Sequence, residues 1–272
     1  MTAYSKDEIK RLLAIARGAA LKSGDSLIHA GQRLRRVEVD LKRDVKIFAD
    51  RASERIIVKY LSERSAFPIL TEESGLLKRG RSAGGLRWIV DPLDGTINYS
   101  RALPVSCVSI GLWDENKPLA GVIYDFNRSE LFTGITGSGS WLNGGKIRVG
   151  GLSAKEKAVL LTGFPGKADH SQKALSRLVA GIRRYKKVRL IGSAALSLAY
   201  VASARADVYF EKDIMLWDVA AGIPIVLGAG GAVKIDHPRG DDICDVKASN
   251  AYLMAEGKRE RDNNTELRRV WP

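Results

Sequence analysis

The chain has 272 residues, of which 45% are hydrophobic, and a formal net charge of +13. This length and composition describe an ordinary globular protein with a large core in one or two domains. The two cysteines, Cys107 and Cys244, are too few for a disulfide framework, so the composition excludes a small disulfide-stabilised secreted domain.

The N-terminal region is predicted to contain two helices. Ser5 opens a capping box with Glu8, and apolar residues follow at helical spacing, so a long helix begins there. A second helix is expected over residues 50–62, whose apolar residues share one face. Residues 45–48 are too few to classify. The N-terminus lacks an apolar signal core, and we expect a cytoplasmic protein without a membrane segment.

The middle and C-terminal parts of the chain follow two different patterns. Between residues 87 and 149, β-prone runs separated by Gly-rich turns predict an antiparallel sheet. After residue 150, strands alternate with helices, which is typical of an α/β layer. We therefore expect two halves, residues 1–150 and 151–272. The expected strands are 68–70, 88–90, 105–113, 119–124, 131–136, 147–149, 159–162, 188–191, 208–210, 232–235 and 252–255, and the later helices are 171–185, 193–204 and 217–229.

The most informative stretch is residues 88–99. Asp91 and Asp94 flank Pro92 directly after an apolar run. Because proline fixes φ and lacks a backbone donor, we expect the strand to end there in a turn with both carboxylates facing one pocket. Clustered carboxylates suit Mg²⁺. An ordinary surface turn is the alternative, since Asp, Pro and Gly favour turns for local reasons.

Two further acidic motifs accompany this stretch. Glu72 and Glu73 follow a strand-like run, and catalytic residues of layered folds often lie at strand ends. Asp218 lies near the start of a long apolar helix, where it could be a simple helix cap.

Together, and in this order, these motifs resemble the inositol monophosphatase family of magnesium-dependent, lithium-sensitive phosphatases, and the resemblance covers nearly the whole chain. It implies a layered α/β (α+β) fold, an α-β-α-β-α sandwich in which an N-terminal antiparallel-sheet half meets a C-terminal mixed-sheet half at a metal cleft. It also implies a homodimer. The matching residues are Glu72-Glu73, the signature from Asp91 to Thr96 with Asn98-Tyr99 behind it, Gly192-Ser193-Ala194, Glu211 and Trp217-Asp218.

The resemblance assigns a role to each matched position. Glu72 and the Thr96 hydroxyl would orient and deprotonate the attacking water, and Asp50 would support a further, weaker metal. Phosphate oxygens would be held by the backbone amides of Gly95 and Thr96. Glu211 would bind a substrate hydroxyl. The implied ligands of two or three magnesium ions, with manganese as an alternative, are Glu72, Asp91, the carbonyl of Leu93, Asp94 and Asp218, and the implied substrate contacts also include Gly192, Ser193 and Ala194.

Several observations bear on this assignment. The four carboxylates would bring too much negative charge for one cleft without cations. Three scattered histidines argue against a zinc site, and no P-loop motif is present. Thr71 stands where the family usually has glycine, and Ser193 stands where threonine is frequent. Helix capping alone would also explain Ser193.

We therefore expect a magnesium-dependent phosphomonoesterase that hydrolyses inositol monophosphate or a related small sugar phosphate by metal-activated water attack. The enzymatic alternatives are a fructose-1,6-bisphosphatase and a 3′(2′),5′-bisphosphate nucleotidase. An alternative of another class is a basic RNA- or partner-binding protein that retains the fold. The basic groups at 33–36, 78–87, 183–189 and 258–269 are dispersed and lack interleaved aromatics. That pattern favours a solvated basic surface that attracts anionic substrates over a nucleic-acid site.

Overall fold

The computed structural model describes residues 4–30, 37–41, 44–77, 85–164, 171–239 and 242–259. These residues form three sheets of two, eight and five strands. Most of the basic groups predicted at 33–36, 78–87 and 258–269 lie outside the described residues. None of the helices in the described part of the chain has the length and apolar character that a membrane crossing needs.

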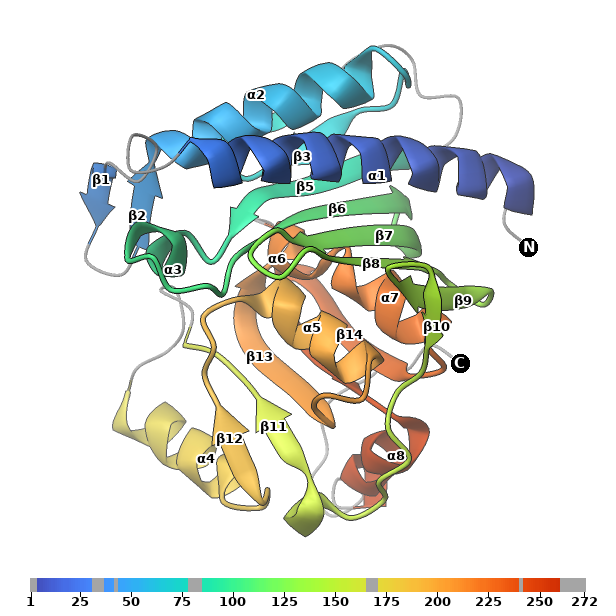
Figure 1. Ribbon diagram of the computed structural model, residues 1–272. Helices are drawn as coiled ribbons and strands as arrows, with labels where there is room; N and C mark the ends of the chain where they lie inside the picture. The colour runs from blue at the N-terminus through green and yellow to red at the C-terminus, as the bar shows by residue number, and fades with distance from the viewer. Residues whose placement is uncertain are drawn as a thin grey trace.

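The elements stack in five layers (Figure 1). Helices α1 (Lys6–His29) and α2 (Phe48–Ser62) cover the outer face of the eight-stranded sheet. One group of helices fills the space between the two large sheets, and another lies beyond the five-stranded sheet. The predicted α-β-α-β-α sandwich is therefore confirmed. The inner helices are α5 (Ala194–Ala202), α6 (Leu216–Val219) and α7 (Gly222–Gly228), and the outer ones are α4 (Gln172–Ile182) and α8 (Ala251–Arg259).

The two N-terminal helices follow from local sequence signals. Ser5 accepts a hydrogen bond from the amide of Glu8 (3.1 Å), which is the predicted cap of α1. At the start of α2, the Asp50 carboxylate accepts a hydrogen bond from the amide of Ile47 (2.7 Å). This bond satisfies an amide that lies outside the helical ladder. Helix α2 therefore begins at Phe48, two residues before the predicted start.

The eight-stranded sheet has the order β10-β9-β8-β7-β6-β5-β3-β4. Neighbouring strands are antiparallel except for the parallel pair of β3 and β5. The prediction missed β4 and β9, and the predicted strand at 147–149 ends at Ile147. The strands are β3 (Ile69–Thr71), β4 (Gly75–Leu77), β5 (Leu86–Asp94), β6 (Cys107–Asp114), β7 (Lys117–Asp125), β8 (Glu130–Ile135), β9 (Gly139–Leu142) and β10 (Gly145–Ile147). The small separate sheet pairs β1 (Val37–Leu41) with β2 (Asp44–Ile47).

Strand β5 does not end at Pro92, which corrects the sequence prediction. It runs on to Asp94, and its register against β6 shifts between Asp91 and Asp94. A bulge leaves the intervening residues out of the hydrogen-bond ladder, so the missing amide of Pro92 costs no ladder bond there. The two aspartates therefore lie on one bulged strand rather than on a turn.

The five-stranded sheet has the order β12-β11-β13-β15-β14, with β15 antiparallel to both neighbours. The strand predicted at 252–255 is wrong, because these residues lie in α8. Asn250 caps that helix by accepting a hydrogen bond from the amide of Leu253 (2.9 Å). The strands are β11 (Val159–Leu161), β12 (Lys187–Arg189), β13 (Val208–Met215), β14 (Ala232–Arg239) and β15 (Ile243–Ser249).

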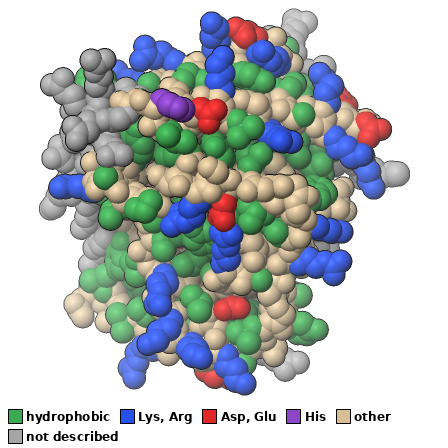
Figure 2. Space-filling view, in the orientation of Figure 1, with side chains coloured by type: hydrophobic (Ala, Val, Ile, Leu, Met, Phe, Trp, Pro, Cys, Tyr) green, Lys and Arg blue, Asp and Glu red, His purple; other side chains and the backbone are tan. Residues whose placement is uncertain are grey.

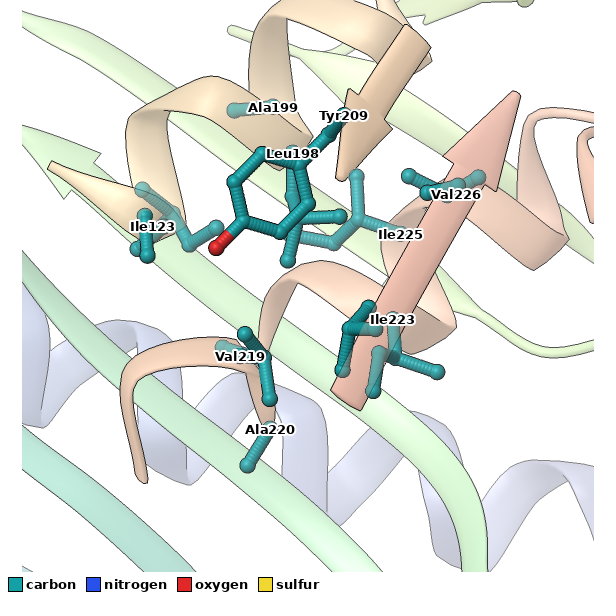
Figure 3. Packing of buried hydrophobic residues seen from close by; sticks show 14 of the residues in the cluster. Ile123, Leu198, Ala199, Tyr209, Val219, Ala220, Ile223, Ile225 and Val226 are labelled. Atoms are coloured by element: carbon teal, nitrogen blue, oxygen red, sulfur yellow. The ribbon is translucent and has the colours of Figure 1, made fainter. Parts of the chain in front are cut away.

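The inner layer packs closely on the eight-stranded sheet (Figure 3). Gly111 and Gly121 lie beneath α6 and α7, where an added Cβ would lie 2.7 and 2.0 Å from backbone oxygens of Ala220 and Ala221. The single helix predicted over 217–229 is instead two short helices. Pro224 cannot donate to the Ala220 carbonyl, which accepts a hydrogen bond from the Trp113 indole (2.8 Å) instead. This contact fixes α6, and therefore Asp218, over the sheet.

Candidate active site

Three carboxylates from distant parts of the chain meet between the two large sheets. One oxygen each from Glu72, Asp91 and Asp218 lies within 4.8 Å of the others. Glu72 comes from the turn after β3, Asp91 from β5 and Asp218 from α6. Asp91 is buried, and the other two are half-buried. The fold thus brings together three of the residues that were predicted to bind metal.

The electrostatics of this cluster favour a cation. Burial raises the pKa of Asp91 well above its ordinary value, and the charges of Glu72, Asp94 and Asp218 raise it further. The pKa of Asp218 is also raised, first by burial and then by Glu72, Asp94 and Glu211. Neighbouring carboxylates cannot all ionise at low cost in a buried site. A bound divalent cation would instead favour the ionised form of these carboxylates. Carboxylate oxygens are also the ligands that Mg²⁺ and Ca²⁺ prefer.

A buried hydroxyl beside the cluster supports the same conclusion. Ser109 on β6 pairs with Asp91 on β5, and directly opposite residues place their side chains on the same face of a sheet. Within the described part of the chain, the Oγ of Ser109 has no hydrogen-bond partner. Such an atom needs a polar neighbour, and the hydration water of a bound cation would supply one. The residues present therefore fit a divalent cation.

Asp94 lies beside the cluster and faces the N-terminus of α5. Its Oδ2 accepts hydrogen bonds from the Ser193 hydroxyl (2.5 Å) and the Ala195 amide (2.7 Å). Burial raises the pKa of Asp94 to about 6, although these hydrogen bonds oppose the shift. Ser193 also caps α5, since its Oγ accepts a hydrogen bond from the Leu196 amide (3.2 Å). The two interpretations of Ser193, a helix cap and a contact at the site, are therefore compatible.

The turn after β5 joins the cluster to α2. Thr96 Oγ1 lies 3.1 Å from Asp50 Oδ1 and 2.9 Å from the Leu93 carbonyl oxygen, and either oxygen can accept a hydrogen bond from the Thr96 hydroxyl. Gly95 has a φ of +88°, and an added Cβ would lie 2.6 Å from the Val105 carbonyl oxygen. Only glycine fits this position without strain. Gly95 and Thr96, predicted to bind phosphate, therefore lie together at the start of the short helix α3 (Thr96–Ser100), with the predicted catalytic residue Asp50 in reach of Thr96.

The C-terminal side of the site contains Glu211. Burial raises its pKa to about 7, against the hydrogen bond donated by the Tyr209 hydroxyl (3.0 Å). The charge of Asp94 also raises this pKa, so the two side chains lie on the same site. An added Cβ on Gly163 would lie 2.4 Å from Glu211 Oε1. Gly163 therefore makes room for this carboxylate, a role that the sequence did not indicate.

Asn98 connects two segments next to the site that are far apart in the sequence. Its amide nitrogen donates to the carbonyl of Val105 (2.9 Å), seven residues away, and to that of Ile191 (2.8 Å), 93 residues away. Gly192 follows with a φ of +71°, and an added Cβ would lie 3.0 Å from the Asn98 amide nitrogen. These contacts set the position of the loop that leads into Ser193.

The sequence prediction missed two polar residues of α2. Ser53 donates to the carbonyl of Pro92 (2.5 Å), next to Asp91. Glu54 accepts hydrogen bonds from Thr71 and Ser74, which flank Glu72. Both residues are buried on a helix that was assigned only an apolar face. Their spacing of three and four residues from Asp50 is the signal that could have revealed them.

The fold and the cluster together define a layered α/β protein with an acidic cation site between its two large sheets. The chain belongs to the inositol monophosphatase family, whose model matches residues 8–261. This confirms the resemblance inferred from the motifs.

The chain is similar to known proteins named SuhB and to known inositol monophosphatases. A protein of Xylella fastidiosa named Nus factor SuhB is 42% identical over 234 residues, which cover 82% of this chain and 83% of that protein. An inositol-1-monophosphatase of Synechocystis is 38% identical over 240 residues, covering 85% and 81%. The crystal structure of the extragenic suppressor protein suhB from Bartonella henselae superposes with a TM-score of 0.82 at 35% identity, covering 94% of this chain and all of that one.

Proposed function

We propose that the protein is a magnesium-dependent phosphomonoesterase that acts on inositol monophosphate or a related small sugar phosphate. The observation that carries this proposal is the convergence of Glu72, Asp91 and Asp218 within 4.8 Å. Asp94 and the Leu93 carbonyl would complete the ligands of two or three ions, with manganese as an alternative to magnesium. The family membership supports a phosphatase activity.

When bound, a divalent cation would neutralise charge on the phosphoryl oxygens and lower the pKa of the attacking water. Glu72 and the Thr96 hydroxyl would orient that water for in-line attack on phosphorus. The ester P–O bond would break as the new P–O bond forms, and the departing oxygen would take a proton from solvent water. The Thr96 hydroxyl lies 3.1 Å from Asp50 Oδ1. Asp50 can therefore receive the proton of Thr96 Oγ1 as this hydroxyl takes one from the water.

The remaining residues would hold the substrate. The amides of Gly95 and Thr96 donate to the phosphate oxygens, because the Gly95 turn leaves no side chain in the way. Glu211 on β13 would accept a hydrogen bond from a hydroxyl of the sugar or inositol ring. The loop of Gly192, Ser193 and Ala194 would contact the same ring. This arrangement favours small polyhydroxylated phosphate esters.

The test is phosphate release from a panel of esters by the purified full chain. We expect hydrolysis that requires magnesium, stops with a chelator and falls when lithium is added. Catalytic efficiencies on inositol monophosphate, fructose 1,6-bisphosphate and 3′,5′-bisphosphate nucleotides decide among the three enzymatic candidates. Hydrolysis unaffected by chelation would refute the proposed mechanism.

A second candidate function is binding to RNA or to a protein partner. Two observations favour it: the similar protein named Nus factor SuhB and the net charge of +13. Lysine and arginine side chains are spread over the face shown in Figure 2 rather than gathered in one patch. Salt-dependent retention of RNA by an Asp91→Asn variant without activity would support this candidate.

For the phosphatase proposed first, we also propose a homodimer and a location in the cytoplasm.

A further inference from the structure

Helix α2 presents three polar side chains to three different segments of the site. Asp50, Ser53 and Glu54 are spaced so that they lie on one face of the helix. Asp50 reaches the Thr96 hydroxyl and Ser53 reaches the Pro92 carbonyl. Glu54 contacts neither of these segments, and its partners lie in the turn between β3 and β4.

Both oxygens of the Glu54 carboxylate are used within this turn. Oε1 accepts hydrogen bonds from the Thr71 hydroxyl and the Ser74 amide (3.1 Å), and Oε2 accepts one from the Ser74 hydroxyl (2.7 Å). Glu54 is only 6% exposed, and a carboxylate buried to this degree needs such donors. The helix is thus bonded to the last residue of β3, Thr71, and to the last residue of the turn that follows it, Ser74.

The residues enclosed by these bonds include Glu72 of the carboxylate cluster. On one side, β3 is held by its parallel pairing with β5. On the other side, β4 is a three-residue strand at the edge of the sheet, and its central residue Leu76 is 49% exposed. The sheet therefore fixes the start of the turn, which follows β3, more firmly than its end, which precedes β4. The hydrogen bonds from Ser74 to Glu54 supply the second attachment.

We propose that Glu54 is a positioning residue that fixes Glu72 in reach of a cation shared with Asp91 and Asp218. It acts through Thr71 and Ser74 and does not touch the ion itself. The inference deepens the proposed function, because it takes the cation site as its starting point. Direct hydrogen-bond partners of metal ligands typically change metal affinity or activity 10- to 100-fold when they are removed. Glu54 acts one contact further from Glu72, so we expect an effect at the lower end of this range.

The test compares variants that remove the contact with and without a change of charge. Thr71→Val keeps the volume of the side chain at position 71 and leaves the charge of Glu54 unchanged. It removes one of the hydrogen-bond donors to Glu54. Ser74→Ala removes another, and Glu54→Gln exchanges one acceptor oxygen for a donor. The control is Glu63→Gln, which makes the same charge change just beyond the end of α2, where Glu63 pairs with Arg64 (3.0 Å). Manganese binding to the full chain is measured by calorimetry, and folding by thermal unfolding.

We expect Glu54→Gln and Thr71→Val to weaken manganese binding about tenfold and to raise the magnesium midpoint of phosphatase activity equally, with kcat recovering at saturating magnesium. Glu63→Gln should match the wild type. A lower Tm with unchanged manganese affinity in both variants would mean a purely structural role and would overturn the proposal. Wild-type protein that binds manganese but hydrolyses no ester would refute the proposed function alone.

Discussion

Without a divalent cation, the substitution Asp91→Asn should raise the free energy of unfolding relative to the wild type. With the cation bound, it should lower this free energy. The ligand oxygens of Glu72, Asp91 and Asp218 lie within 4.8 Å of one another, and two ionised carboxylates at that spacing repel by about 3 kcal/mol at an effective dielectric constant of about 20. Asparagine keeps the shape and removes the charge. The cation-free variant should therefore gain about 3 kcal/mol in free energy of unfolding at neutral pH.

The pH dependence of this gain follows from the direction of the pKa shift. Because the folded state raises the pKa of Asp91, the carboxyl lowers the free energy of unfolding above its ordinary pKa of about 4 and has no effect below it. The variant should thus unfold roughly 6–12 °C higher than the wild type at neutral pH in chelator, and at the same temperature below about pH 4.

Thermal unfolding followed by circular dichroism, with chelator and with magnesium, measures both effects. Magnesium should stabilise the wild type and leave the variant nearly unchanged, because one of the three clustered carboxylates is gone. Asp7→Asn is the matched control, since Asp7 is an exposed helical aspartate paired with Lys10. The reasoning is refuted if the variant is less stable than the wild type in chelator, or if magnesium stabilises both equally.

Three further outcomes are expected. Glu72→Gln should retain part of the cation affinity but lower kcat at saturating magnesium, and a normal kcat in steady-state kinetics would exclude its role with the water. Ser193→Ala should raise KM more than it lowers kcat and should cost about 1 kcal/mol in chemical denaturation, because it removes the cap of α5 and a donor to Asp94. Since the pKa of Glu211 is about 7, its carboxylate is available as an acceptor only above that pH, so KM should rise as the pH falls below 7. Glu211→Gln should remove this dependence from the pH profile of KM, and an unchanged profile would contradict the assignment.

Local patterns predicted most of the fold. The capping box at Ser5 and the helical spacing behind it placed α1, and the β-prone runs placed β5 to β8. The errors arose where a distant contact decided the local structure. The Trp113 indole donates to the Ala220 carbonyl, which a continuous helix would have used at residue 224. The Asn250 side chain caps α8 where a strand was expected, and its amide nitrogen is held by the distant carbonyls of Gly150 and Leu152.

The candidate site was likewise predictable only where local motifs marked its residues. Acidic residues in characteristic motifs revealed Glu72, Asp91 and Asp218 from the sequence, and the fold brings them together. The spacing of Glu54 from Asp50 could have placed it on the same face of α2, but its partners Thr71 and Ser74, like the contact of Gly163 with Glu211, depend on which segments lie opposite in space. The division of the chain at residue 150 stays a prediction.

The most direct test of the central claim is anomalous diffraction from crystals grown with manganese. We expect a manganese peak bonded to carboxylate oxygens of Glu72, Asp91 and Asp218, at the position where these side chains converge. Manganese bound elsewhere, with these three carboxylates free of metal, would contradict it.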